Sequence, residues 1–128
     1  MKYFFENKHN SLVFGANGEI GSACVKVLKN AGADVTEIDL NCPSKPSKQN
    51  KFLKCDVSNI EDVINSAKKI KSIHSVIYAV GLNHDSKVID TDWKEYREVM
   101  SANLDSAFHI AAVFGKRMAT QGFGSFVF

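Results

Sequence analysis

The stretch VFGANGEIG, residues 13–21, places three glycines between a short apolar run and the start of a helical pattern. Gly15 permits a sharp turn, Gly18 lets the backbone approach a pyrophosphate, and Gly21 lets the helix pack closely on the strand. Amide groups at the start of that helix would then face the phosphates. The stretch therefore predicts a dinucleotide-binding turn formed by Gly15, Asn17, Gly18, Ile20 and Gly21.

The sequence around this turn supports the same interpretation. Residues 11–14 are typical of a buried strand, and Asp39 ends the next expected strand, at the distance that the dinucleotide-binding fingerprint requires. A carboxylate there can accept a hydrogen bond from a ribose hydroxyl. A phosphate loop of the G-x-x-x-x-G-K-[ST] type is excluded, because Ile20 and Gly21 stand where Gly and Lys are required. A tight turn without a ligand is the remaining alternative.

Strand and helix patterns alternate along the whole chain, which indicates a sheet built from β-α-β units. Strands are expected at 11–14, 34–38, 51–54, 74–80 and 125–128. Gly32 would close the first helix in a left-handed cap, and Ser58 or Asn59 would begin the second. The last helix would begin at Asp90 or Asp92 and run to about residue 120. Its apolar residues form more than one stripe, so it requires two packing partners.

The composition indicates one globular domain, residues 1–128, with 45% hydrophobic and 23% charged residues. A net charge of +2 does not favour nucleic acid as a partner. The lysines Lys45, Lys48, Lys51 and Lys54 cluster beside prolines and serines that favour a solvated loop. The N-terminal MKYFF is too short for a signal peptide or a membrane span, so a cytoplasmic protein is expected. Cys24, Cys42 and Cys55 are interpreted as free thiols, and no metal site is expected.

A hydrolase is disfavoured, because the chain has no G-x-S-x-G elbow and no histidine at a recognised spacing from a nucleophile. His84 and Asp85 follow the fourth expected strand, at the edge where open sheets bind ligands. We interpret them as polar residues of a surface loop.

Several segments in a fixed order carry a resemblance to a known family: FGANGEIG at 14–21, EIDL at 37–40, CDVSN at 55–59, YAVG at 78–81 and SANLDSAFHIAAVFGKRM at 101–118. With them the chain resembles the short-chain dehydrogenase/reductases over essentially its whole length. GSFVF at 124–128 resembles the family's fifth strand. The resemblance implies an α/β fold, a doubly wound, Rossmann-like parallel sheet of about five strands in the order 3-2-1-4-5, with helices on both faces.

The resemblance also assigns roles to single residues. Asp56 and the backbone of Val57 would hold the adenine, and Ala79 and Gly81 would line the ribose side of the cofactor. Asn103 matches the family's helix-borne Asn, which supports a proton relay, and is the one catalytic residue expected in this chain.

NAD is the cofactor that the resemblance implies. Asp39 would bind the adenosine ribose and repel the 2′-phosphate of NADP, and neither Leu40 nor Asn41 supplies an arginine. Glu19 occupies the middle-glycine position of the family's shorter branch, and its charge beside the pyrophosphate predicts weak binding. Two further departures are Phe14 in place of the usual Thr, and YAVG in place of the usual NNAG.

The family's catalytic Ser follows the fifth strand, and its Tyr-x-x-x-Lys pair lies on the next helix. This chain ends before all three, and Tyr3, Tyr78 and Tyr96 have no lysine at that offset. We therefore expect a truncated, nucleotide-binding half that is inactive by itself. Two interpretations stay open: the N-terminal piece of an NAD-dependent dehydrogenase, or a stand-alone binding or structural module that has lost catalysis.

A homodimer is the expected assembly. The strand at 125–128 would have an edge without a partner, which invites pairing with another chain. The 92–120 helix would leave apolar side chains in water, with Trp93, Tyr96, Phe108 and Phe114 among them. Full burial of each is worth about 1.5–3 kcal/mol. A two-fold dimer through this helix and the terminal strand would recover that energy.

Overall fold

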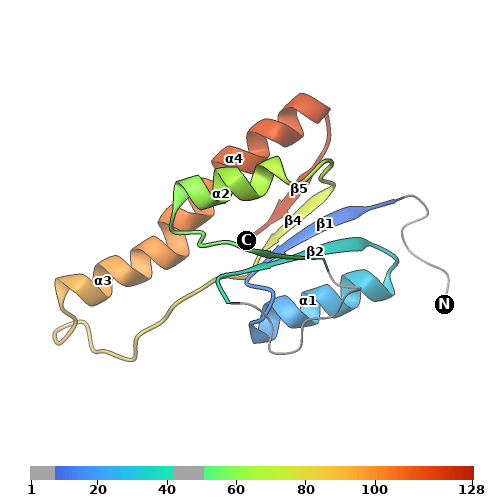
Figure 1. The fold of residues 1–128 in the computed structure, drawn as a ribbon. Coiled ribbons are helices and arrows are strands. Elements are labelled where there is room, and N and C mark those ends of the chain that lie inside the picture. The colour runs from blue at the N-terminus through green and yellow to red at the C-terminus, as the bar shows by residue number, and fades with distance from the viewer. Residues whose placement is uncertain (1–7, 42–50) are drawn as a thin grey trace.

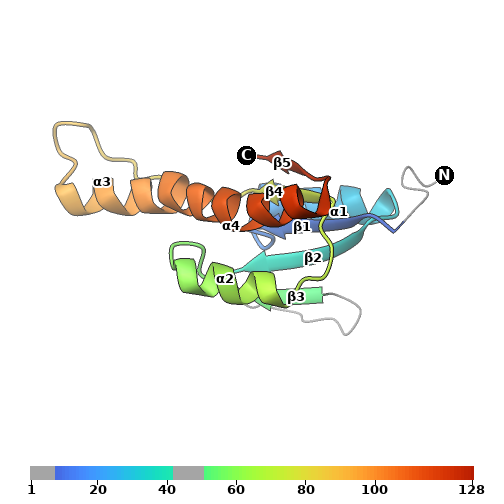
Figure 2. The ribbon, with the colours of Figure 1, turned by 90° about the horizontal axis from the view of Figure 1, so that it is seen from above.

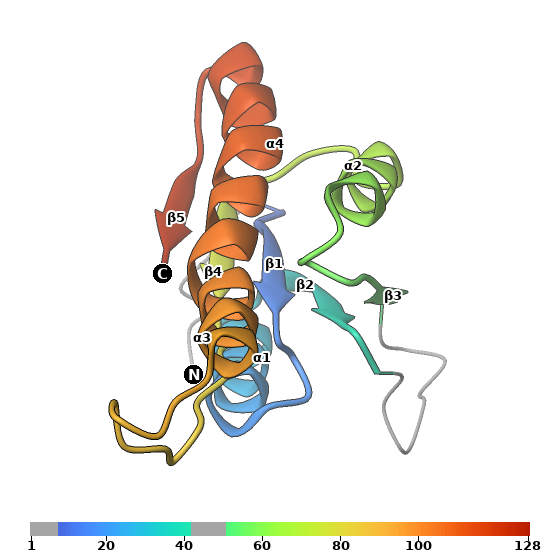
Figure 3. The same ribbon diagram turned by 90° about the vertical axis from the view of Figure 1, so that its left-hand side faces the viewer.

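The computed structural model describes residues 8–41 and 51–128, which form one five-stranded parallel sheet in the order β3-β2-β1-β4-β5. Figure 3 shows the strands in this order, from β5 at one edge to β3 at the other. The expected fold class and strand order are confirmed. The predictions on Lys45, Lys48, Cys42 and the MKYFF stretch fall outside the described residues.

The elements follow the alternation that the sequence predicts. The strands are β1 (Asn10–Phe14), β2 (Asp34–Asp39), β3 (Lys51–Lys54), β4 (Ser75–Tyr78) and β5 (Ser125–Val127). The helices are α1 (Glu19–Asn30), α2 (Ile60–Lys68), α3 (Trp93–Met100) and α4 (Ser106–Gln121), with the π-helix η1 (Ser101–Asp105) between the last two. Within the described ranges, no helix is long and apolar enough to cross a membrane.

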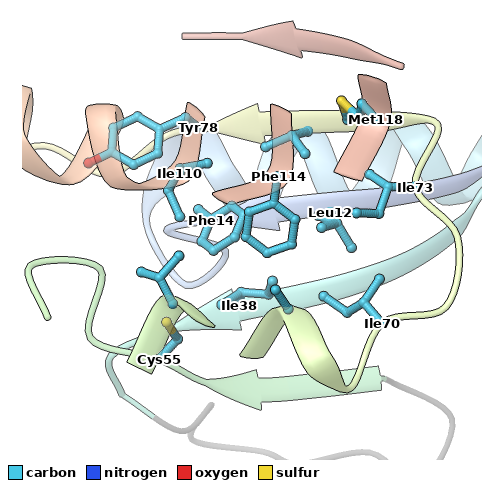
Figure 4. Close-up of a cluster of buried hydrophobic side chains, with 13 residues drawn as sticks. Leu12, Phe14, Ile38, Cys55, Ile70, Ile73, Tyr78, Ile110, Phe114 and Met118 are labelled. Carbon is cyan, nitrogen blue, oxygen red and sulfur yellow. The ribbon is translucent and has the colours of Figure 1, made fainter. Parts of the chain in front are cut away.

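The helices cover both faces of the sheet. α1 lies on one face, and α2 and α4 lie on the other. α3 extends beyond the carboxyl ends of the strands (Figures 1 and 2). Successive residues of a strand point to opposite faces. Val13 and Val35 accordingly pack with Val25 of α1, whereas Leu12 and Phe14 join the cluster under α2 and α4 that Figure 4 shows.

The ends of the helices are set by the residues that the sequence indicates. Asn59 caps α2, since its Oδ1 accepts from the Glu61 amide at 3.0 Å, and Asp92 caps α3 through the Glu95 amide at 2.8 Å. Of the two alternatives for each cap, these are the ones observed. Gly32, with φ of 93°, follows the end of α1, and Gly122 ends α4 with φ of 85°.

The long helix differs from the expectation in two respects. It contains the π-helical turn η1, so α3 and α4 do not form one regular helix. Phe114, expected on an exposed apolar face, is fully buried, and this prediction was wrong. The reason is that Ile110, Phe114 and Met118 form the stripe of α4 that packs on the sheet. Sequence spacing gave several apolar stripes, and only the packing decides which one faces the sheet.

Candidate functional site

The glycine turn lies at the carboxyl ends of β1, β2 and β4. The amides of Gly15 and Ala16 both donate to the Ile38 carbonyl, at 2.9 and 3.2 Å. Gly15 has a φ of 75°, and a Cβ there would lie 2.6 Å from the Ala79 carbonyl oxygen. A Cβ on Gly21 would lie 2.0 Å from the Gly15 oxygen. Both positions therefore require glycine, because backbone atoms occupy the space that a side chain needs.

The start of α1 leaves its first amides free of side-chain partners. Gly18 stands at the N-cap position and makes no side-chain cap, unlike Asn59 and Asp92 at the starts of α2 and α3. The first N–H groups of a helix have no partner inside the helix, and its N-terminus carries a partial positive charge. The side chain of Ile20 in this first turn is 72% exposed. The turn is thus an open cradle of backbone donors, which suits an anion.

Asp39 lies beside this cradle at the end of β2. Its Oδ2 accepts from the Asn17 amide at 3.0 Å, and its Oδ1 accepts from the Asn41 amide at 3.1 Å. The Asn17 side chain in turn donates to the Asn41 carbonyl at 2.6 Å. Each carboxylate oxygen keeps a further lone pair. Asp39 is therefore held in place by the glycine turn and can still accept from a ligand hydroxyl.

Asp56 and Val57 follow β3 at the same edge of the sheet. The Cys55 amide donates to the Asp39 carbonyl at 2.9 Å, which brings the two strand ends together. Asp56 Oδ1 accepts from the amide and the hydroxyl of Ser58, at 2.9 and 2.6 Å. The Val57 carbonyl accepts from Nδ1 of His109 at 3.0 Å. These contacts hold Asp56 and Val57 in place, and the His109 bond fixes the segment that follows β3 against α4.

Asn103 lies on η1 and holds the segment that follows β4. Its Oδ1 accepts from the Leu82 amide and its Nδ2 donates to the Leu82 carbonyl, both at 2.8 Å. Gly81 is next to this pair, since a Cβ on it would lie 3.5 Å from Asn103 Oδ1. Ala79 in turn donates its amide to the Phe14 carbonyl at 2.9 Å. Asn103 is therefore linked to the loop that passes the glycine turn.

One buried group at this edge is missing from the sequence-based interpretation. The Tyr78 hydroxyl donates to the Ala102 carbonyl at 2.8 Å and contacts the Ser106 hydroxyl. Burial raises the pKa of Tyr78, and the Ser106 hydroxyl offsets this in part. The signal in the sequence was a phenol at the end of the buried strand SVIY, because a buried tyrosine usually has a hydrogen-bond partner.

The predicted residues thus form two groups at one edge of the sheet. The first consists of the glycine turn, Asn17, Asp39, Asp56 and Val57, and the second of Ala79, Gly81 and Asn103. His84 and Asp85 are on the loop beyond, where Nε2 of His84 lies 3.4 Å from Oε2 of Glu98. Among residues 8–41 and 51–128, no three potential metal ligands gather at one place. Cys24 and Cys55 are free thiols, as expected, and burial raises the pKa of Cys55.

Comparison with known sequences gives matches over nearly the whole chain. Residues 15–128 match the family model described as enoyl-(acyl carrier protein) reductase. An uncharacterized oxidoreductase of Schizosaccharomyces pombe is 30% identical, over 92% of this chain and 50% of its own. A tropinone reductase homolog of Arabidopsis thaliana is 31% identical over the same shares. A 3-oxoacyl-[acyl-carrier-protein] reductase of Rickettsia typhi is 26% identical, over 91% and 51%. The chain spans about half the length of these curated relatives.

Comparison with solved structures gives the same fold. A short-chain dehydrogenase of Leptospira borgpetersenii with bound NAD+ superposes with a TM-score of 0.83 at 21% identity, over 91% of this chain and 48% of that one. A short-chain dehydrogenase of Streptomyces avermitilis gives 0.86 at 16% identity, over 94% and 48%.

Proposed function

This chain belongs to the short-chain dehydrogenase/reductase family, and we propose that it forms the dinucleotide-binding half of an NAD-dependent oxidoreductase. The glycine turn and the start of α1 would hold the pyrophosphate. Asp39 would bind the adenosine ribose, and Asp56 and Val57 the adenine. Ala79 and Gly81 would line the ribose side of the cofactor. NAD, when bound, would supply the hydride chemistry.

The fit between the glycine turn and the start of α1 carries this proposal. Gly21 approaches Gly15 more closely than any side chain permits, with a hypothetical Cβ at 2.0 Å from the Gly15 oxygen. The helix start beside it makes no side-chain cap. A turn with only a structural role could use a Ser or Asp cap, as α2 and α3 use Asn59 and Asp92. A compact backbone with uncapped amides suits a diphosphate.

The carboxylate of Asp39 supports NAD over NADP. A negative charge at the ribose repels a 2′-phosphate, whereas a nearby arginine would accept it. Leu40 and Asn41 follow in the sequence, and the partners described for Asp39 are the amides of Asn17 and Asn41. Neither partner neutralises the charge, so the carboxylate would meet a 2′-phosphate directly.

Affinity for NAD is proposed to be weak. Glu19 is exposed in the first turn of α1, where its negative charge opposes the pyrophosphate. The contacts proposed here all serve the adenosine and pyrophosphate portion of the cofactor. ADP-ribose should therefore bind about as well as NAD.

Calorimetry with NAD, NADP and ADP-ribose tests the cofactor proposal. NAD and ADP-ribose are expected to bind with similar weak affinity, and NADP more weakly. Asp39→Ala should reduce NAD binding and narrow the difference from NADP. Asp34→Ala is the matched control, because Asp34 lies at the opposite end of β2, paired with Lys51. Tight NADP binding that Asp39→Ala leaves unchanged would overturn the assignment.

Asn103 is proposed to contribute to catalysis through its place on η1. Its side-chain amide makes one accepted and one donated hydrogen bond with the Leu82 backbone, so its own part would be to hold the loop beside the cofactor. Proton transfer to a carbonyl needs an acid, and the tyrosines of this chain have no lysine at the family's offset. We therefore expect no NADH oxidation by this chain with a panel of ketones and aldehydes. Activity that Asn103→Ala abolishes would contradict this.

Self-association is proposed as the second property of the chain. The helical segment that consists of α3, η1 and α4 has four large exposed side chains: Trp93 by 74%, Phe108 by 70%, Leu104 by 57% and Tyr96 by 43%. Tyr96 stacks on Trp93 with ring centroids 5.2 Å apart. A contiguous exposed apolar patch marks an interaction site, and these four side chains are proposed to form one. A homodimer through α3, η1 and α4, with β5 contributing an edge, would cover it.

The same face supports the alternative function, a non-catalytic module that self-associates. Sedimentation at micromolar concentration should show a dimer, and Phe108→Glu should shift it to a monomer. Phe108 is the residue to test, because its side chain is exposed whereas that of Phe114 is buried. A dimer that binds neither NAD nor ADP-ribose would favour the alternative over the oxidoreductase proposal.

A further inference from the structure

The π-helical turn η1 interrupts the helical segment where it passes the end of β4. The Ser106 amide donates to the Ser101 carbonyl, which is the i→i+5 bond of a π-helix. Such turns are rare and occur mostly as single insertions into an α-helix, frequently at functional sites. Because the turn is less favourable than a regular helix, contacts from outside the helix must stabilise it.

Tyr78 supplies contacts of this kind from the sheet. Its hydroxyl donates to the Ala102 carbonyl at 2.8 Å, and the Ser106 hydroxyl donates to the same carbonyl at 2.5 Å. The two hydroxyls also contact each other. Tyr78 is 8% exposed and Ser106 is fully buried, so water does not replace these bonds. In Figure 4 the Tyr78 hydroxyl points away from the apolar cluster.

The π turn decides where Asn103 lies. One residue more or less in a helix rotates the residues before it by about 100° relative to those after it. Without the insertion, the segment before Ser106 would turn by this amount, and Asn103 would no longer face Leu82. The buried contact of Tyr78 and the exposed pair of Asn103 with Leu82 therefore depend on the same turn.

We propose that Tyr78 is a positioning residue for the dinucleotide site. With Ser106 it holds η1 in the π form through the Ala102 carbonyl, and η1 in turn presents Asn103 to the loop after β4. The loop begins at Ala79, directly after Tyr78, and passes the glycine turn. This assignment rests on the proposed function, because the loop has a role only if it lines the cofactor.

Amide hydrogen exchange by NMR tests the geometry without any ligand. Tyr78→Phe keeps the buried ring and removes the hydroxyl. The Leu82 amide, which is bonded to Asn103, should then exchange about tenfold faster, while the amides of β1 keep their protection. Ser106→Ala removes the same support from the helix side and should act in the same direction. Tyr96→Phe is the matched control, because Tyr96 is exposed on α3 and should leave the Leu82 amide unchanged.

Binding is measured on the same variants with NAD by calorimetry. Tyr78→Phe should weaken NAD binding roughly three- to tenfold, as the loss of one positioning hydrogen bond implies, and Tyr96→Phe should leave it unchanged. Unchanged exchange at Leu82 in both folded variants would overturn the role of Tyr78. Faster exchange with unchanged NAD affinity would equally overturn its role at the site. If the parent chain binds no NAD, the proposed function fails, and the exchange data still decide whether Tyr78 holds the turn.

Discussion

The ring of Phe114 meets the ring of Phe14 edge to face, with centroids 5.5 Å apart and an interplanar angle of 66°. This contact joins α4 to the central strand of the sheet, at the residue directly before the glycine turn. Both rings are fully buried. Phe14 stands where the family usually has a threonine, so an aromatic contact with α4 occupies the place of a hydroxyl.

Truncation of the two phenylalanines of α4 should lower the free energy of unfolding by very different amounts. Phe114→Ala should lower the free energy of unfolding by about 3–5 kcal/mol, since it leaves a cavity in the core. Phe108→Ala should change it by less than about 0.5 kcal/mol, because that side chain is in water. Urea denaturation at low protein concentration, where a dimer does not add to stability, gives both values. Equal losses in the two variants would contradict the burial described for Phe114.

Gly21→Ala should destabilise the chain by about 2–3 kcal/mol, because the new methyl would meet the Gly15 carbonyl and force α1 away from β1. Gly115→Ala is the matched control. Gly115 is also helical, but its nearest contact would be Cε2 of Phe126 at 3.8 Å, which is an ordinary distance. There the alanine should be neutral or stabilising by up to about 1 kcal/mol. Thermal and urea unfolding of both variants provide the test, and an unaffected Gly21→Ala chain would show that the turn can open at little cost.

The sequence was sufficient for the fold and for the glycine turn. Residues 13–21 show three glycines at the required spacing. The strands β1 and β4 could be recognised as buried strands because each contains three consecutive apolar residues. Asn59 and Asp92 were each one of two cap candidates, with Ser58 and Asp90 as the alternatives, because short polar side chains favour that position.

The sequence was not sufficient for contacts made between distant segments. Phe114 could be placed only once α4 was seen to lie across the sheet, since helical spacing does not tell which apolar stripe is covered. The π turn depends on Tyr78, which is distant in sequence, and local propensity does not predict such an insertion. Likewise, both hydrogen bonds of the Asn103 side chain are to the backbone of Leu82. Every residue has these backbone groups, so the residue type at position 82 does not predict the contact.

Glu19→Gln should tighten NAD binding several-fold. Two negative unit charges about 7 Å apart in water repel each other by about 0.6 kcal/mol. A pyrophosphate carries two negative charges, so Glu19 would be repelled by both. The gain should shrink when the salt concentration is raised, because Glu19 is exposed and the interaction is screened. Glu61→Gln, in the first turn of α2, serves as the control for the helix-dipole contribution. If the two variants changed NAD affinity equally, Glu19 would not be close to the bound phosphates.

Stability should fall as the pH is lowered below about 6.5, and His9 should account for part of the loss. The pKa of His9 is lowered in the folded chain, first by burial and then by the neighbouring His74. The rings of the two histidines have centroids 4.9 Å apart, and His9 Nε2 lies 3.2 Å from the Ser75 hydroxyl.

The sign follows from linkage. His9 has a lower pKa in the folded chain than in the unfolded chain, where it is 6.5. As the pH falls below 6.5, the unfolded chain therefore takes up this proton first, and the free energy of unfolding decreases. The decrease ends below the folded pKa, where both states carry the proton. Urea midpoints measured between pH 7.5 and pH 5 should therefore decline, and His9→Gln should flatten the decline. His84→Gln is the control variant, because His84 is on the loop after β4, with Nε2 3.4 Å from Oε2 of Glu98 and away from His9. An unchanged slope in His9→Gln would assign the acid sensitivity to other groups.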